Sequence, residues 1–326
     1  MGCRCPSLKR LPPWERIEEI KPNLGVFAQD QWTVHRLTLN AGVRYDYFRA
    51  RVVESHLPAA RWVPARDFPA VEDVPNWKDI NPRVGAAYDL FGNGRTALKV
   101  ALNRYVNGEG TATAVANHPI VRSVLSVSRN WTDGNGDFIP DCDLNNPLAN
   151  NGVYDTCGII SNLNFGLNNP NATTYADDVL RGRGVRGYNW TGSAEVQHQV
   201  FRGTSITAGY YRRWAGNFQA TDNLRVEPGD FDTFCITAPV DSRLPNGGGY
   251  PVCGLYDVVQ SKAGQVVSKV VQAASFGKQT SIYDGFDLTT NARFANGAVL
   301  NGGMNIGRTA TNACFVVDSQ IGRAHV

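Results

Sequence analysis

Four oxygen-bearing side chains stand close together in residues 133–141, the segment D-G-N-G-D-F-I-P-D. Asp133, Asn135, Asp137 and Asp141 occupy positions 1, 3, 5 and 9 of a loop, which are ligand positions in a calcium loop. The pattern is incomplete, because Phe138 replaces the usual glycine and position 12 is not glutamate. The segment therefore predicts either a structural calcium site or a cluster of Asx turns, in which side-chain oxygens accept backbone N–H groups.

Four of the seven cysteines form two pairs within two long connecting segments. Cys142 with Cys157, and Cys235 with Cys253, predict disulfides that staple these segments in an oxidising compartment. Each disulfide is worth roughly 3 kcal/mol on the chain-entropy model. Zinc is the alternative, but the CxxC spacing of zinc sites is absent and no histidines cluster nearby. Cys314 is left without a partner among these pairs.

No set of residues forms a convincing catalytic group. The five histidines are scattered along the chain, and the glycines of residues 92–94 read as a turn because no helix follows them. Arg181, Arg183 and Arg186 make a small basic spot among glycines, which favours a solvated loop over an anion site. We therefore expect no enzyme and no cofactor other than the possible calcium ion.

Composition excludes two further classes of protein. The net charge is +3 and charged residues make up 19% of the chain, without the basic stripe of a nucleic-acid binder. No apolar run reaches the ~18 residues of a transmembrane helix. A transmembrane β-barrel stays open, because its strands alternate between apolar and polar residues.

Alternation with a period of two is the main structural signal. In residues 37–48, Leu39, Ala41, Val43, Tyr45 and Tyr47 share one face, and the residues between them are mostly polar. Residues 188–200 show the same pattern, with apolar side chains opposite a run of Asn, Thr, Ser, Glu and Gln. This period predicts strands with one apolar and one polar face. Six aromatic residues suit interfacial girdles: Trp32, Tyr45, Tyr47, Trp190, Tyr210 and Trp214.

Tight turns and long connections alternate along the chain. Short turns at residues 34–36, 91–95, 201–203 and 296–297 predict four hairpins with strands of about ten residues or more, enough to span a bilayer when tilted. Between the hairpins lie the much longer segments 49–78, 107–187 and 218–278. This layout predicts an all-β fold, an antiparallel transmembrane β-barrel with short turns on one side and long extracellular loops on the other.

Two of these hairpins resemble a known family. Residues 25–32, G-V-F-A-Q-D-Q-W, followed by residues 37–46, L-T-L-N-A-G-V-R-Y-D, are similar to a hairpin of TonB-dependent outer-membrane receptors. Residues 81–89 and 94–105 resemble the next hairpin, and the long connections resemble the Oar-like branch. The resemblance covers residues 23–320 and implies an incomplete arc of the receptor barrel, a fragment to which the plug and the TonB contact region do not belong.

The resemblance implies active uptake of a scarce, bulky ligand across the bacterial outer membrane. The implied partners are a TonB-type energy-coupling complex, outer-membrane lipid and a transported ligand of unknown identity, with no nucleic acid. A siderophore, cobalamin, an oligosaccharide and a peptide are all compatible with the loops. The alternatives are a passive outer-membrane porin and a soluble β-rich surface adhesin, whose apolar strand faces would be core.

The sequence at each terminus of the chain is not typical of a native protein. Residues 1–22 lack the apolar core of a secretory signal and predict a non-native or poorly ordered start, before a barrel domain over residues 23–320. The codons ATC-GGA-AGA-GCA-CAC-GTC encode residues 321–326, and this string is similar to a sequencing adapter. We therefore expect residues 321–326 to be an artefact.

Overall fold

All four predicted hairpins are present in the computed structural model, which describes residues 7–10 and 15–313. They are β2 (Glu18–Val34) with β3 (Leu37–Val52), β6 (Asn76–Asp89) with β7 (Thr96–Val106), β13 (Tyr188–Phe201) with β14 (Thr204–Gly216), and β19 (Thr280–Arg293) with β20 (Val299–Asn312). The structure therefore confirms the long antiparallel strands and the turns between them.

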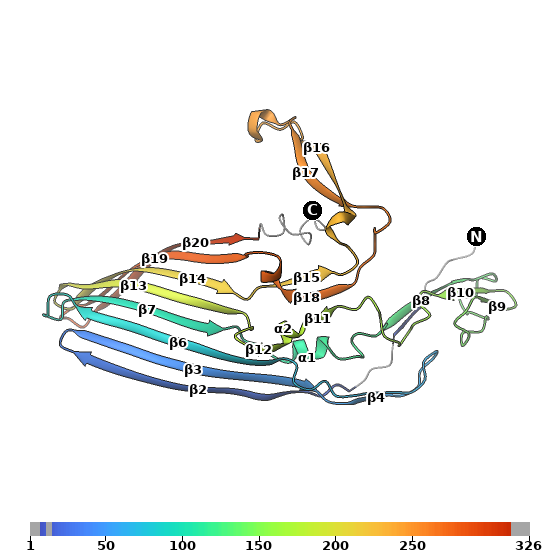
Figure 1. Cartoon of the computed structure of the whole chain (residues 1–326), viewed down its shortest axis with the longest axis horizontal. Coiled ribbons are helices and arrows are strands. Elements are labelled where there is room, and N and C mark those ends of the chain that lie inside the picture. The colour runs from blue at the N-terminus through green and yellow to red at the C-terminus, as the bar shows by residue number, and fades with distance from the viewer. Residues whose placement is uncertain (1–6, 11–14, 314–326) are drawn as a thin grey trace. The chain divides into compact units, whose positions relative to one another are not determined.

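The hairpins join into one antiparallel sheet in the order β2-β3-β6-β7-β13-β14-β19-β20, and the short strand β12 (Arg181–Arg183) pairs with β6 beside this path. The tight turns gather at one end of the sheet (Figure 1). Consecutive hairpins are neighbours in the sheet, as in an up-and-down meander. The long connections therefore all leave the sheet at the end opposite the turns.

Local chemistry explains the turns. In the turn between β6 and β7, the Asp89 carboxylate accepts the backbone N–H groups of Gly92 at 3.0 Å and Gly94 at 2.8 Å. Gly94 has φ +70°, a left-handed value that glycine adopts without steric cost. In the last hairpin, Gly297 has φ +85° and the Asn296 side chain accepts the Ala298 N–H at 3.1 Å. In both turns, a side-chain acceptor and a glycine with positive φ therefore stabilise the reversal of the chain.

The chain divides into two compact units. Unit 1 comprises residues 1–22, 49–76 and 109–174, and unit 2 comprises residues 23–48, 77–108 and 175–326. Cys3, Cys5, Cys314 and the predicted artefact at residues 321–326 lie outside the described residues of both units. Strand β1 (Ser7–Arg10) pairs with β8, and β2 starts at Glu18, five residues before the predicted start of the barrel domain.

Unit 1 is a small folded body rather than a set of plain loops. It contains a sheet in the order β1-β8-β10-β9, from β8 (Ser126–Thr132), β9 (Asn150–Asn151) and β10 (Thr156–Ile160). The hairpin of β4 (Ser55–Leu57) with β5 (Arg66–Phe68) and helix α1 (Ala112–Ala116) complete it. Its apolar core is formed by Val63, Val127, Ile160 and Phe165, with Trp62 and Val124 packed against them.

The connections of unit 2 also carry secondary structure. Strand β18 (Ser268–Gln272) pairs with β11 (Thr174–Tyr175) and β15 (Gln219–Asn223), and β16 (Phe231–Thr237) forms a hairpin with β17 (Pro251–Val258). Helix α2 (Asp177–Leu180) immediately precedes β12, and three short 3-10 helices lie at Pro228–Asp230, Pro245–Gly247 and Ala273–Ser275. Within the described residues, no helix is sufficiently long and apolar to cross a membrane.

Candidate functional site

One face of the main sheet is apolar, and its side chains line up across neighbouring strands. One row consists of Ala86, Val100, Ala194, Tyr210, Phe286 and Ile306, each directly opposite the next. The adjacent row consists of Tyr88, Leu98, Val196, Ala208, Leu288 and Met304. Phe286 is 60% exposed and Ile306 is 68% exposed. A contiguous exposed apolar surface of this kind needs an apolar environment.

The opposite face is polar and internally hydrogen-bonded. Lys99 donates to the Gln197 side chain at 2.7 Å, and the Tyr211 hydroxyl donates to Glu195 at 3.1 Å. Further along, Asn305 donates to the Asp287 carboxylate. These residues come from β7, β13, β14, β19 and β20, which are five of the six strands that carry the apolar rows. The predicted division of the strands into two faces is therefore present across the sheet.

Glycines leave room for an aromatic ring on this polar face. Gly285 and Gly307 are directly opposite each other on β19 and β20. A Cβ on either would come within 2.4 Å of the Tyr283 hydroxyl, so the Tyr283 side chain lies flat across both positions. The two glycines therefore leave the space that the Tyr283 ring occupies on the polar face.

A gap in the wall between β6 and β7 is filled by one arginine. The ladder between these strands stops at Arg83, next to Pro82, which has no N–H to donate. Beyond this point the Arg104 guanidinium supplies the hydrogen-bond donors. It donates to the Ile80 carbonyl at 3.0 Å and to the Asn81 side chain at 2.8 Å. A partly buried carbonyl at the end of the ladder therefore accepts a hydrogen bond from a side chain.

The same guanidinium compensates a buried carboxylate. Asp79 is 1% exposed, and its carboxylate lies 3.9 Å from Arg104. Arg104 is 8% exposed and lies over the Tyr188 ring at 4.4 Å. Asn81 in turn donates to Asp46 at 2.7 Å, so the polar groups at this end of the sheet form one network. Sequence analysis missed this network because nothing in the local pattern marks it.

The segment that carries α2 and β12 is anchored at the same place. The Trp77 indole donates to the Val179 carbonyl at 2.9 Å, and the Gly184 N–H donates to the Lys78 carbonyl at 2.9 Å. Arg186, the buried member of the predicted basic spot, lies over the rings of Phe48 at 5.2 Å and Trp77 at 5.3 Å. Arg186 is therefore packed against the sheet, whereas Arg181 and Arg183 are exposed, as in the solvated loop that the sequence favours.

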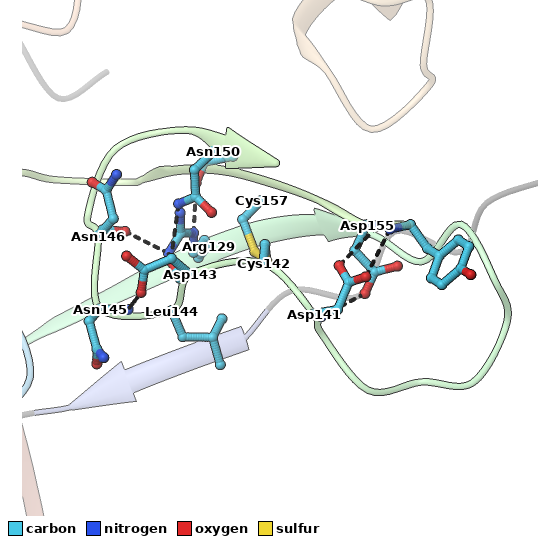
Figure 2. Close-up of a disulfide and its surroundings, with 12 residues drawn as sticks. Arg129, Asp141, Cys142, Asp143, Leu144, Asn145, Asn146, Asn150, Asp155 and Cys157 are labelled. Carbon is cyan, nitrogen blue, oxygen red and sulfur yellow. Dashed lines mark hydrogen bonds between the residues drawn. A yellow bond between two sulfur atoms is a disulfide. The ribbon is translucent and has the colours of Figure 1, made fainter. Parts of the chain in front are cut away.

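The structure forms both predicted disulfides, Cys142–Cys157 and Cys235–Cys253. The first closes a loop around a buried arginine, as Figure 2 shows. Arg129, 2% exposed, donates to the carbonyls of Gly158 at 2.7 Å, Asn146 at 2.8 Å and Leu148 at 2.7 Å. The second disulfide joins β16 to β17. Both staples lie in the long connections.

The four residues of the predicted calcium site lie in one loop, and their oxygens accept backbone N–H groups. Asp133 accepts from Gly136 at 2.7 Å and Phe138 at 3.1 Å, and Asp137 accepts from Ile139 at 2.7 Å. The Asn135 side-chain oxygen Oδ1 accepts from the Asp137 N–H at 3.2 Å. This arrangement is the Asx-turn alternative of the sequence analysis.

A partner that the sequence did not reveal completes this loop. Asp155 is 1% exposed and accepts the Gly134 N–H at 3.0 Å. It also accepts the Asp141 N–H at 3.1 Å (Figure 2). Asp141 in turn accepts the Tyr154 N–H at 2.8 Å. Within the part of the chain that the structure describes, no three His, Cys, Asp or Glu side chains gather in a way that could hold a metal ion. Calcium binding stays a prediction.

The comparisons with known proteins point to one family. A family model described as an outer membrane beta barrel domain matches residues 7–304. No curated protein matches the chain. The matched span contains the first three hairpins of the main sheet, β19, the start of β20 and both disulfide-stapled connections.

Proposed function

The chain belongs to the outer membrane beta barrel domain family, and from that premise we propose that it acts as an active-transport receptor, not as an enzyme. The protein is located in the bacterial outer membrane. The apolar rows face lipid there, and the polar face lines the lumen. The finer proposal is uptake of a scarce, bulky ligand, driven by a TonB-type energy-coupling complex.

The proposal is supported mainly by the difference in structure between the two ends of the sheet. Tight turns close one end, whereas the three long connections that leave the other end are folded, and two of them are stapled by a disulfide. Ordered loops of this kind suit ligand capture, because a pre-organised surface loses less conformational entropy on binding. The resemblance of residues 25–46 to TonB-dependent receptors supports the same function.

Energy dependence tests the proposal. Cells that carry the protein in their outer membrane are given a fluorescent ferric siderophore, cobalamin, an oligosaccharide or a peptide, with and without a protonophore. We expect one probe to accumulate against its gradient and the protonophore to abolish that accumulation. Entry of small sugars that is indifferent to the protonophore, without accumulation of any of the four probes, would contradict active uptake and favour the passive porin.

A further inference from the structure

A pocket lined by three cations opens on the apolar face of the sheet. Its volume is about 540 Å³, and it is lined by Tyr45, Lys78, Ile80, Arg104, Arg183 and Gly184. All of these residues belong to unit 2. The lining contains no carboxylate. A pocket of this size and charge fits a small anionic group such as a phosphate ester.

The position of the pocket on the sheet places it at the edge of the apolar face. Ile80, which is 64% exposed, shares its strand face with Val84 and Tyr88, because successive even-numbered residues of β6 point the same way. The Lys78 ammonium, two residues before Ile80, lies over the Tyr47 ring at 5.6 Å. The pocket is thus on the lipid side of the wall, toward the end from which the long connections leave.

Aromatic residues mark the same level of the sheet. Arg104 is directly opposite Trp190, and Trp190 is directly opposite Trp214. The two indoles stack with their ring centroids 6.3 Å apart. Amphipathic rings of this kind gather where the hydrocarbon layer meets the headgroups, so this row lies at the membrane interface.

Two of the three cations are not neutralised by the protein. Among the described residues, Lys78 and Arg183 form no ion pair, whereas Arg104 shares its charge with Asp79. Arg183 is exposed, and the neighbouring Gly184 N–H is bonded to the Lys78 carbonyl, which fixes β12 against β6. The backbone therefore holds these two cations side by side at a lipid-facing interface.

We propose that Lys78, Arg183 and Arg104 form a binding site for the phosphate group of an anionic lipid in the leaflet that faces the long connections. The charge of the pocket selects the headgroup, and the exposed Ile80 and neighbouring apolar rows contact the acyl chains. This inference does not depend on whether transport through the barrel is active or passive.

Quenching by brominated lipid tests the site on the full chain. The protein is reconstituted in phosphatidylcholine vesicles, and brominated phosphatidic acid is compared with brominated phosphatidylcholine as a quencher of tryptophan fluorescence. Because each cation near a membrane surface contributes roughly a fivefold preference for anionic lipid, the double variant Lys78→Gln with Arg183→Gln should lose about thirtyfold of the preference. The charge-preserving variant Lys78→Arg with Arg183→Lys should retain most of it.

The control removes equal charge elsewhere. Arg202→Gln with Arg213→Gln neutralises one cation in a tight turn and one on the polar face of β14, and it should leave the lipid preference unchanged. Equal losses in both double variants would overturn the proposal in favour of unspecific attraction. Full competition by inorganic phosphate in the buffer, at the concentration of the lipid phosphate, would overturn it in favour of a soluble-anion site. Urea unfolding verifies that every variant is folded.

Discussion

At the scale of single residues, the Arg104 side chain donates a hydrogen bond to a strand carbonyl, as a backbone N–H group does elsewhere in the sheet. Pro82 removes a donor from β6, and the Arg104 guanidinium reaches the Ile80 carbonyl at 3.0 Å. The same group stands 3.9 Å from the buried Asp79 carboxylate. Removing it would take a donor from the Ile80 carbonyl and break the ion pair of the buried Asp79 carboxylate.

We therefore predict that Arg104→Met destabilises the protein by about 3–5 kcal/mol, the cost of removing one partner from a buried ion pair. Urea unfolding in lipid vesicles, followed by tryptophan fluorescence, measures the change. Arg213→Met, an exposed arginine on the polar face, is the matched control. Adding Asp79→Asn to Arg104→Met should recover part of the loss, and a single variant as stable as the unchanged chain would refute the role of Arg104.

The aspartates of residues 133–155 permit a test of hydrogen bonding against metal binding. Asp133 accepts two backbone N–H groups, so Asp133→Asn keeps an acceptor whereas Asp133→Ala keeps none. We expect the alanine variant to lose about 1–3 kcal/mol of loop stability and the asparagine variant to lose less. Limited proteolysis of this loop measures both. If millimolar Ca²⁺ protects the unchanged loop and Asp133→Asn abolishes that protection, the loop is a calcium site instead.

Acid should loosen unit 1 through a buried histidine. Burial, and secondarily the positive charge of Arg16, lowers the pKa of His118 from its ordinary value of 6.5, and the ring nitrogen Nδ1 accepts the Ile120 N–H at 3.3 Å. The unfolded chain thus binds the proton more readily, so the stabilisation is complete above pH 6.5 and is lost as the pH falls below it. Protease cleavage within residues 109–174 should rise in that range. A His118→Asn variant should flatten the profile, and an identical acid response in both chains would exclude His118 as the cause.

At the scale of elements, the strands were predictable and the connections were not. Period-two alternation, together with the turns at residues 34–36, 91–95, 201–203 and 296–297, predicts the four hairpins that the structure contains. The pairing of β12 with β6 has no local signal, because it depends on the early end of the β6–β7 ladder at Arg83. Asp155 was likewise missed, since its partners lie 14 and 21 residues away.

Neighbouring residues of one strand test which face of the sheet meets lipid. Leu288 belongs to an apolar row, and the next residue, Thr289, points to the polar face. We predict that Leu288→Arg costs about 2–4 kcal/mol when it lies near the bilayer midplane, whereas Thr289→Arg costs little because its charge enters the wet lumen. Folding into phosphatidylcholine vesicles, followed by urea titration, compares them. Equal effects of the two substitutions would show that the two faces have the same surroundings.

At the scale of the whole molecule, the alternation of residue types predicts the class of protein but not the ligand that it binds. Apolar and polar rows extend across β6, β7, β13, β14, β19 and β20, and the family match agrees with the outer-membrane barrel that this alternation predicts. The ligand is not encoded in that alternation, because every barrel wall needs it. Specificity depends on connections whose folds arise from contacts between distant residues.

Site-directed spin labelling measures whether one face of this sheet meets lipid while the other lines a wet lumen. Single cysteines along residues 193–197 of β13, in a chain with serine at positions 3, 5 and 314, would carry a nitroxide label in lipid vesicles. We predict that labels at Ala194 and Val196 are reached by oxygen dissolved in the bilayer, and that labels at Ser193, Glu195 and Gln197 are reached by a water-soluble nickel chelate. Access of the nickel chelate to every position, without alternation, would contradict the account.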